Sequence, residues 1–134
     1  MKGFFPDKSD HGAVTPFEYL PCGAITPKAG LALVLTNGLL ALATGTTAPT
    51  YICMKDADAA ATAGTIIPVV RVDKDRIYET TNSAAFSSAK IGTKVTLHTD
   101  GLQVTATTTN GVAEIVDFDD KAKSGAGGTV HVRF

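Results

Sequence analysis

Short runs of β-branched residues and leucine, separated by turn residues, fill the chain from Ile25 onward. The separating residues are Asn-Gly, Asp-Gly or glycine-rich stretches, and this punctuation between short apolar runs is typical of β-strands. We therefore predict an all-β fold, a small β-barrel or β-sandwich built of hairpins with at most one short helix. The expected strands are Leu31–Thr36, Leu39–Thr44, Thr50–Met54, Thr65–Val72, Arg76–Thr80, Thr93–Thr99, Leu102–Thr107, Val112–Phe118 and Thr129–Phe134.

The one expected helix is a short piece near Ser83–Lys90. Asn82 or Ser83 can cap its N-terminus, and Gly92 follows its end. The segment Asp56–Gly64 is expected to form either a helical turn or a loop.

Two hairpins share one motif, LVLTNGLLALATG at Leu33–Gly45 and TLHTDGLQVTATT at Thr96–Thr108. In the second, a two-residue type I′ turn at Asp100-Gly101 pairs Leu97 with Val104 and collects the apolar side chains on one face. The opposite face is then polar and predicted to be wet, with Lys94, Thr96, His98, Gln103, Thr105 and Thr107.

The upstream hairpin turns at Asn37-Gly38 and is apolar on both faces. One of these faces must be covered either by another layer of the same chain or by another subunit, and we favour another subunit. The predicted oligomer interface consists of Leu33, Leu35, Leu40 and Leu42.

Residues 1–23 contain prolines, polar clusters and isolated aromatic residues without a sustained period. This composition predicts an extended N-terminal arm that precedes a single β-rich domain at residues 24–134. The aromatic residues either fold back onto the core of their own chain or dock onto a partner. They are Phe4, Phe5, Phe17 and Tyr19.

Charge and hydropathy exclude several classes of partner. The formal net charge is −1 and the basic residues are scattered singly, so the clustered basic face that binds nucleic acid is missing. No apolar run reaches the ~20 residues that cross a bilayer, and no signal-peptide core follows Met1. We expect no nucleic acid and no membrane as partner, and a chain used without export. Cys22 and Cys53 could pair, but in that setting we favour reduced thiols.

No catalytic or metal-binding arrangement emerges from the sequence. His11, His98 and His131 lack metal-ligand spacing, and we expect His98 and His131 to be solvated on outer strand faces. The aspartates at residues 73–75 and 117–120 are expected to form turns rather than calcium sites. Because nucleophile motifs and phosphate-binding loops are also missing, we predict no enzyme activity, no cofactor and no metal.

The chain from Ala24 to Phe134 resembles, in its overall layout, the small head decoration (capsid-stabilising) proteins of tailed phages and prophages. The resemblance rests on AITPKAGLALVLTNGLLALATGTTAPTYICM, IIPVVRV, IGTKVTLHTDGLQVTATTTNGVAEIVDF and the closing GGTVHVRF. Its most telling pieces are Ala48–Met54, Ile67–Arg71 and Val132–Phe134.

The resemblance implies a virion structural protein, made in the host cytoplasm, that binds the outer surface of an icosahedral head and stabilises the capsid lattice. It also implies a homotrimer whose N-terminal arms dock on the major capsid protein through Phe4, Phe5, Phe17 and Tyr19. Two alternatives stay open. One is another virion component, such as a tail or head-fibre protein, and the other is a glycan-binding β module, for which the chain has no Trp to offer.

Overall fold

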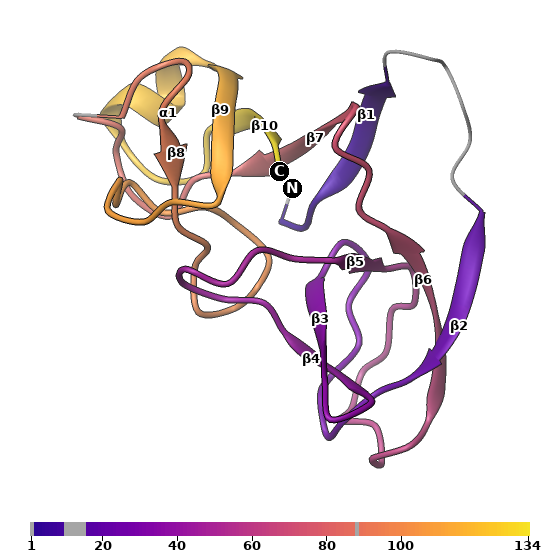
Figure 1. The fold of residues 1–134 in the computed structure, drawn as a ribbon. Coiled ribbons are helices and arrows are strands. Elements are labelled where there is room, and N and C mark those ends of the chain that lie inside the picture. Colours follow the sequence, from indigo (N-terminus) through magenta and orange to yellow (C-terminus); the bar gives the residue numbers. More distant parts are fainter. Residues whose placement is uncertain (1, 10–15, 88) are drawn as a thin grey trace.

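The structure is a computed structural model that describes residues 2–9, 16–87 and 89–134. It is mostly β, with two antiparallel sheets of five strands and one short helix, which confirms the predicted fold class. The sheets are not closed into a barrel. They lie next to each other, one in the upper part of Figure 1 and one in the lower part.

The upper, first sheet has the strand order β1-β7-β10-β9-β8. Its strands are β1 (Phe5–Ser9), β7 (Arg76–Thr81), β10 (Thr129–Arg133), β9 (Ala113–Phe118) and β8 (Lys94–Val95). The lower, second sheet has the order β2-β6-β5-β3-β4. Its strands are β2 (Phe17–Pro21), β6 (Ile66–Arg71), β5 (Tyr51–Cys53), β3 (Ala32–Thr36) and β4 (Leu39–Leu42).

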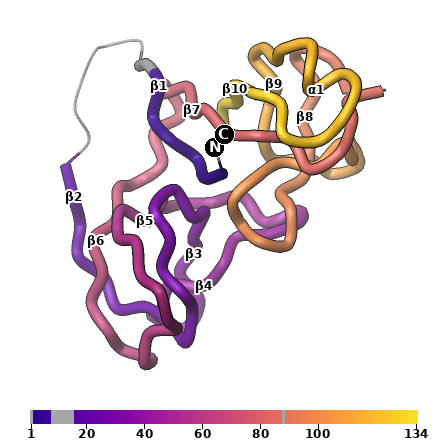
Figure 2. The backbone as a smooth tube through the Cα atoms, turned by 180° about the vertical axis from the view of Figure 1, so that it is seen from behind, coloured from indigo at the N-terminus to yellow at the C-terminus, as the bar shows by residue number. Residues whose placement is uncertain are grey.

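The N-terminal segment up to Pro21 contributes one strand to each sheet. β1 pairs with β7 and β2 pairs with β6, both antiparallel. The two chain ends lie near each other in both views (Figures 1 and 2), and the rings of Phe4 and Phe134 are 5.4 Å apart between centroids. The sequence pattern indicated only an extended arm here, because the strands that order it lie more than forty residues away along the chain.

The β3–β4 hairpin has the predicted register, with Leu33 opposite Leu42 and Leu35 opposite Leu40. Asn37 and Gly38 have φ values of 52° and 79°. A type I′ turn requires positive φ at both central positions, and Asn-Gly tolerates it best. Here the local sequence determines both the turn and the pairing.

The hairpin predicted at Asp100-Gly101 forms only in part. Leu97 does pair with Val104, but as an isolated bridge, and β8 ends at Val95. Of the two central turn residues, Asp100 and Gly101, only Gly101 has a positive φ, 69°. Its N–H donates to the carbonyl oxygen of His98. The turn is therefore not type I′, and the regular ladder expected on either side of it does not develop.

The prediction that this hairpin has a wet polar face is wrong for Thr96 and Gln103, which are buried. The Oγ1 atoms of Thr96 and Thr105 are 2.6 Å apart, and Nε2 of Gln103 donates to Oδ2 of Asp100 at 2.9 Å. Burial is tolerated because these hydrogen bonds replace the ones that water would make.

The helix predicted at Ser83–Lys90 is also wrong, since α1 spans Asp120–Ser124. Its N-cap is Asp119, whose carboxylate accepts a hydrogen bond from the Ala122 N–H at 3.0 Å. Backbone hydrogen bonds, first that of Ala122 and then that of Thr129, lower the pKa of Asp119. The acidic stretch at residues 117–120, expected to form a turn, instead ends β9 and begins α1.

Asn82, expected as a helix cap, instead anchors the segment 120–128. Its side chain is fully buried. Nδ2 lies 2.7, 3.0 and 2.9 Å from the carbonyl oxygens of Ala84, Ala122 and Gly125, and Oδ1 accepts from the Gly128 N–H at 2.8 Å. A side chain committed to these long-range bonds cannot also cap a local helix.

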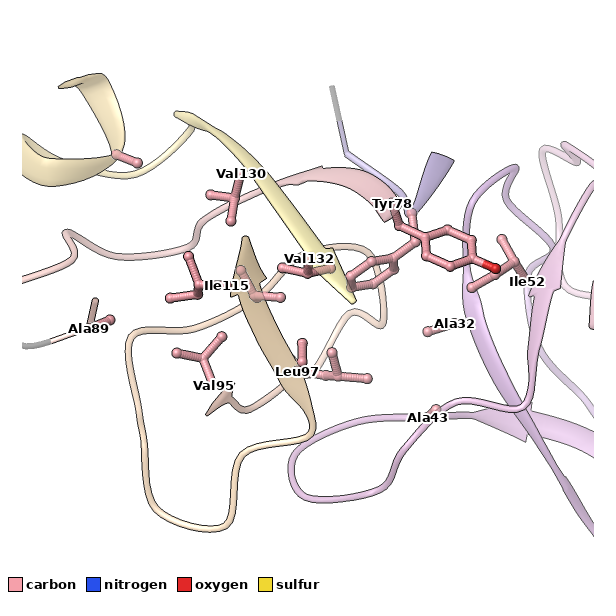
Figure 3. Packing of buried hydrophobic residues seen from close by; sticks show 14 of the residues in the cluster. Ala32, Ala43, Ile52, Tyr78, Ala89, Val95, Leu97, Ile115, Val130 and Val132 are labelled. Atoms are coloured by element: carbon pink, nitrogen blue, oxygen red, sulfur yellow. The ribbon is translucent and has the colours of Figure 1, made fainter. Parts of the chain in front are cut away.

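A hydrophobic core shared by both sheets holds them together. The first sheet contributes Ile115, Val130 and Val132, and the second contributes Ala32 and Ile52 (Figure 3). A second cluster gathers around the second sheet alone and comprises Cys22, Leu31, Leu33, Leu40, Tyr51, Cys53, Ile67 and Val69. The second sheet is therefore covered on parts of both faces by its own chain.

We expect Asn82→Ala to lower the free energy of unfolding by about 2–4 kcal/mol, because several buried polar groups lose their only side-chain partner. Asn82→Asp should also destabilise the protein, since it keeps an acceptor for Gly128 but offers no donor to the carbonyl oxygens. Urea denaturation followed by circular dichroism measures both. The exposed Thr108→Ala is the control, and an Asn82→Ala variant as stable as that control would contradict the anchoring role.

Candidate functional site

The most prominent exposed feature of the described chain is an apolar face on strands β2 and β6. β2 pairs with β6 over its whole length, with Phe17 opposite Val70, Tyr19 opposite Pro68 and Pro21 opposite Ile66. Alternate residues of a strand share a face, and so do directly paired residues. We call this set the β2–β6 face; its members are Phe17, Tyr19, Pro21, Ile66 and Pro68.

Three side chains of the β2–β6 face are strongly exposed. Phe17 is 51% exposed, Tyr19 65% and Ile66 56%. Val70, the partner of Phe17, is instead buried in the core shared with the first sheet. The face thus begins at the shared core and continues outward along β2, which forms the outer edge of the molecule in both views (Figures 1 and 2).

An ion pair on the opposite side of the sheet fixes β2 in place. Arg71 donates from Nε and Nη2 to the two carboxylate oxygens of Glu18, at 3.2 and 3.1 Å. The guanidinium also lies over the Tyr51 ring, 5.0 Å from its centroid. The hydrogen bonds of Glu18, followed by the charge of Tyr51, raise the pKa of Arg71. This two-point contact sets the position of the edge strand that carries Phe17 and Tyr19.

Among the residues that the structure describes, β2 is paired on one side only, because it is the terminal strand of its sheet. Just beyond it, Cys22 bridges to Leu40 and the Gly23 N–H donates to the Leu40 carbonyl. The outer edge of β2 itself therefore leaves backbone donors and acceptors available to another strand.

The four aromatic residues assigned to the N-terminal arm have different positions. Phe4 is fully buried in the shared core, and Phe5 is half-buried on β1. Phe17 and Tyr19 are the two that remain exposed. Of the four aromatic residues expected to dock onto a partner, only Phe17 and Tyr19 are therefore exposed enough to do so.

The four leucines predicted to form an oligomer interface also differ in burial. Leu33 and Leu40 are fully buried in the cluster around the second sheet, so the chain itself covers them. Leu35 and Leu42 are 42% and 38% exposed on the same hairpin. An interface with another subunit can therefore involve Leu35 and Leu42.

The described residues contain no cluster of metal-binding side chains, and both cysteine thiols are buried. Residues 2–9, 16–87 and 89–134 contain no group of three or more His, Cys, Asp or Glu arranged to hold a metal ion. Cys22 and Cys53 are buried free thiols, and burial raises the pKa of Cys53, which opposes nucleophilic reactivity. In the same part of the chain no helix is long and apolar enough to cross a membrane. His11 lies outside the described residues.

His131 does not occupy the solvated position expected for it. It lies on β10, its side chain is 21% exposed, and it contacts the carboxylates of Asp7, Glu79 and Asp117. These residues come from β1, β7 and β9, so only the strand order could have revealed the cluster. His98 was also expected to be solvated, and its side chain, which lies beside Asp100, is 37% exposed.

A shallow polar hollow adjoins the glycine-rich loop before β10. Lys2, Thr81, Ser83, His98, Gln103 and Gly127 line it. Asp100 lies within 3.8 Å of the Lys2 ammonium and 3.2 Å of the His98 ring, so both side chains already have an acidic partner. The hollow offers hydroxyl and amide groups but no buried reactive group.

No family model, curated protein or solved structure matches this chain. The geometry of the β2–β6 face and the resemblance carried by residues 24–134 are the remaining grounds for a function.

Proposed function

We propose that this chain is a structural protein of a phage head, which binds the outer surface of the shell and stabilises the capsid lattice. The β2–β6 face is its contact with the major capsid protein, and Phe17 and Tyr19 are the principal contact residues. The observation that carries the proposal is the exposure of these two rings on a strand that is open at one edge. The resemblance to head decoration proteins supports the choice of partner.

A rigid strand with exposed aromatic rings is suited to bind another folded surface. The ordered backbone loses little conformational entropy on binding, because β2 is already paired with β6 and fixed by Arg71. Burial of a large apolar side chain contributes about 1.5–3 kcal/mol. A sheet edge of the shell protein can also add to the open edge of β2 through main-chain hydrogen bonds.

Weak individual contacts are sufficient for such a role. A head presents many equivalent sites, and a trimer would bring three β2–β6 faces to them at once. Binding through several linked contacts exceeds the affinity of each contact by a large factor. We therefore assign Leu35 and Leu42, exposed on the β3–β4 hairpin, to the contact between copies of this chain.

A glycan-binding module is the second candidate, and the same face favours it. Phe17 and Tyr19 occupy alternate positions of β2, so two exposed rings lie on one side of the strand. Sugar rings stack on aromatic platforms of this kind. The experiment on shell binding separates the two candidates, because a glycan binder would not require the shell protein.

We predict that replacing both Phe17 and Tyr19 with Ala weakens binding to heads assembled without this chain by at least about a hundredfold, as expected when two buried rings are lost. The measurement is co-sedimentation of the purified protein with such heads, followed by electron cryo-microscopy of the complexes. Ile91→Ala is the matched control, because Ile91 is 69% exposed but lies outside the β2–β6 face.

Wild-type density on the outer head surface, lost in the double variant and kept in the control, is the expected result. Equal binding of wild type and double variant would contradict the role of the face. Absence of wild-type protein from the heads, with binding to an arrayed glycan, would replace the proposal with the second candidate.

We predict that Leu35→Lys together with Leu42→Lys converts a trimer to a monomer, because burying a lysine charge in an apolar contact is costly. Sedimentation equilibrium at micromolar concentration measures the mass. Thr36→Lys, on the same strand but on the other face of the hairpin, is the control and should leave the trimer intact. A monomeric wild type would refute the subunit contact.

A further inference from the structure

His131 lies at the centre of a row of charged side chains that crosses the first sheet. It is opposite Glu79 of β7 on one side and opposite Asp117 of β9 on the other. β1, beyond β7, adds Asp7 to the row. One imidazole thus meets carboxylates from three other strands.

The two ring nitrogens of His131 have carboxylate partners on both sides. Nδ1 is hydrogen-bonded to Oδ1 of Asp117. Nε2 lies 3.2 Å from Oε1 of Glu79 and 3.4 Å from Oδ2 of Asp7. The oxygens therefore lie on opposite sides of the ring rather than converging on one point, which favours a proton on each nitrogen over a bound metal.

Only the imidazolium form satisfies this arrangement. It carries an N–H on both nitrogens, whereas neutral imidazole has one N–H and one lone pair. Loss of the proton would turn a lone pair toward a carboxylate oxygen and remove the positive charge that His131 places between the three carboxylates. The charged groups facing the ring are Asp7 of β1, Glu79 of β7 and Asp117 of β9, while its neighbours on β10, Val130 and Val132, are apolar and buried.

The balance of these influences raises the pKa of His131 above its ordinary value of 6.5. Burial lowers it, but the hydrogen bond and charge of Asp117, the charge of Asp7 and the hydrogen bond of Glu79 outweigh burial. A group with a raised pKa in the folded state stabilises that state fully below its unfolded pKa. This stabilisation is lost as the pH rises through the folded value, which lies above 6.5.

Strand β1 is the element that depends most on this cluster. It is the terminal strand of the first sheet and, within residues 2–9, 16–87 and 89–134, pairs only with β7. Its pairing is interrupted at Asp7, between Pro6 and Lys8, and Pro6 has no N–H to donate. Its start is held separately, because Phe4 is buried in the shared core and donates its N–H to the Gly30 carbonyl at 2.7 Å.

We propose that protonated His131 is a latch that fastens the second half of β1, Asp7–Ser9, to the first sheet. Loss of the proton releases this half and leaves the outer edge of β7 unpaired, while Phe4 keeps the start of the strand in place. The latch rests on contacts within the first sheet and is independent of the function proposed for the β2–β6 face.

The test combines an NMR titration of the histidine rings with amide hydrogen exchange between pH 5.5 and 8.5. We expect His131 to titrate above its ordinary pKa. The protection factors of β1 should fall about tenfold through the same range, as expected when a hydrogen bond to a charged group is lost. Protection of Ile115 and Val132, in the interior of the sheet, should fall less than that of β1. A His131 that titrates at or below 6.5 would overturn the proposal.

Variants separate the latch from general effects of pH. In His131→Gln, which cannot carry the charge, protection of β1 should be low and independent of pH. Asp7→Asn should abolish the pH dependence in β1 while His131 still titrates, and it leaves the other two carboxylates in place. His98→Gln is the matched control, because the aspartate that His98 contacts, Asp100, belongs to the chain between β8 and β9 and not to β1. Unchanged pH dependence of β1 in His131→Gln or Asp7→Asn would refute the latch.

Discussion

Strands β1 and β2 come from one short N-terminal segment, yet they pair with different sheets. β1 adds to the sheet that contains the C-terminal strand, and β2 adds to the sheet that contains the β3–β4 hairpin. Phe4, just before β1, lies in the core that both sheets share, and its ring packs against that of Phe134. The β2–β6 face and the histidine cluster both depend on this division. The rings of the β2–β6 face are exposed because β2 is an edge strand. The histidine cluster forms because β1 brings Asp7 beside His131.

The same division explains why the aromatic residues of one segment differ so much in burial. Phe4 precedes β1 and is fully buried in the core to which both sheets contribute. Phe17 and Tyr19 lie farther out on β2, on a side of the second sheet that the first sheet covers only as far as Val70. Two large rings exposed to water lose the free energy that burial would contribute, and nothing in the packing of the described residues requires their exposure. That cost is the physical reason to expect a partner for this face.

The sequence predicted the local features well and the long-range ones poorly. The Asn37-Gly38 turn and the register around it could be read directly, because Asn-Gly combines with alternating apolar residues to define one pairing. The Asp100-Gly101 turn failed in detail because a side chain of its own, Asp100, binds Leu102 and Gln103 and reshapes the loop. The helix was misplaced because Asn82 is bound to residues some forty positions away.

The candidate site could be predicted only in part for the same reason. The sequence left open whether the aromatic residues of the N-terminal segment fold onto the core or dock onto a partner, because their burial depends on the strand pairing of that segment. Leu33 and Leu40 were assigned to a subunit contact because the sequence does not show that the chain forms a second apolar cluster over them. His131 looked like a surface residue because its three carboxylate partners become neighbours only in the order β1-β7-β10-β9.

The two N-terminal strands also differ in how they are held, and this separates their responses to pH. β2 is fixed by the Arg71 guanidinium on Glu18, and the raised pKa of Arg71 keeps this cation charged throughout the range in which a histidine titrates. The second half of β1 relies on an imidazole whose charge changes near neutrality. A rise in pH therefore loosens one strand and leaves the other in position. The β2–β6 face keeps its geometry in both states, so a change in its binding to a partner with pH would have to originate in the partner.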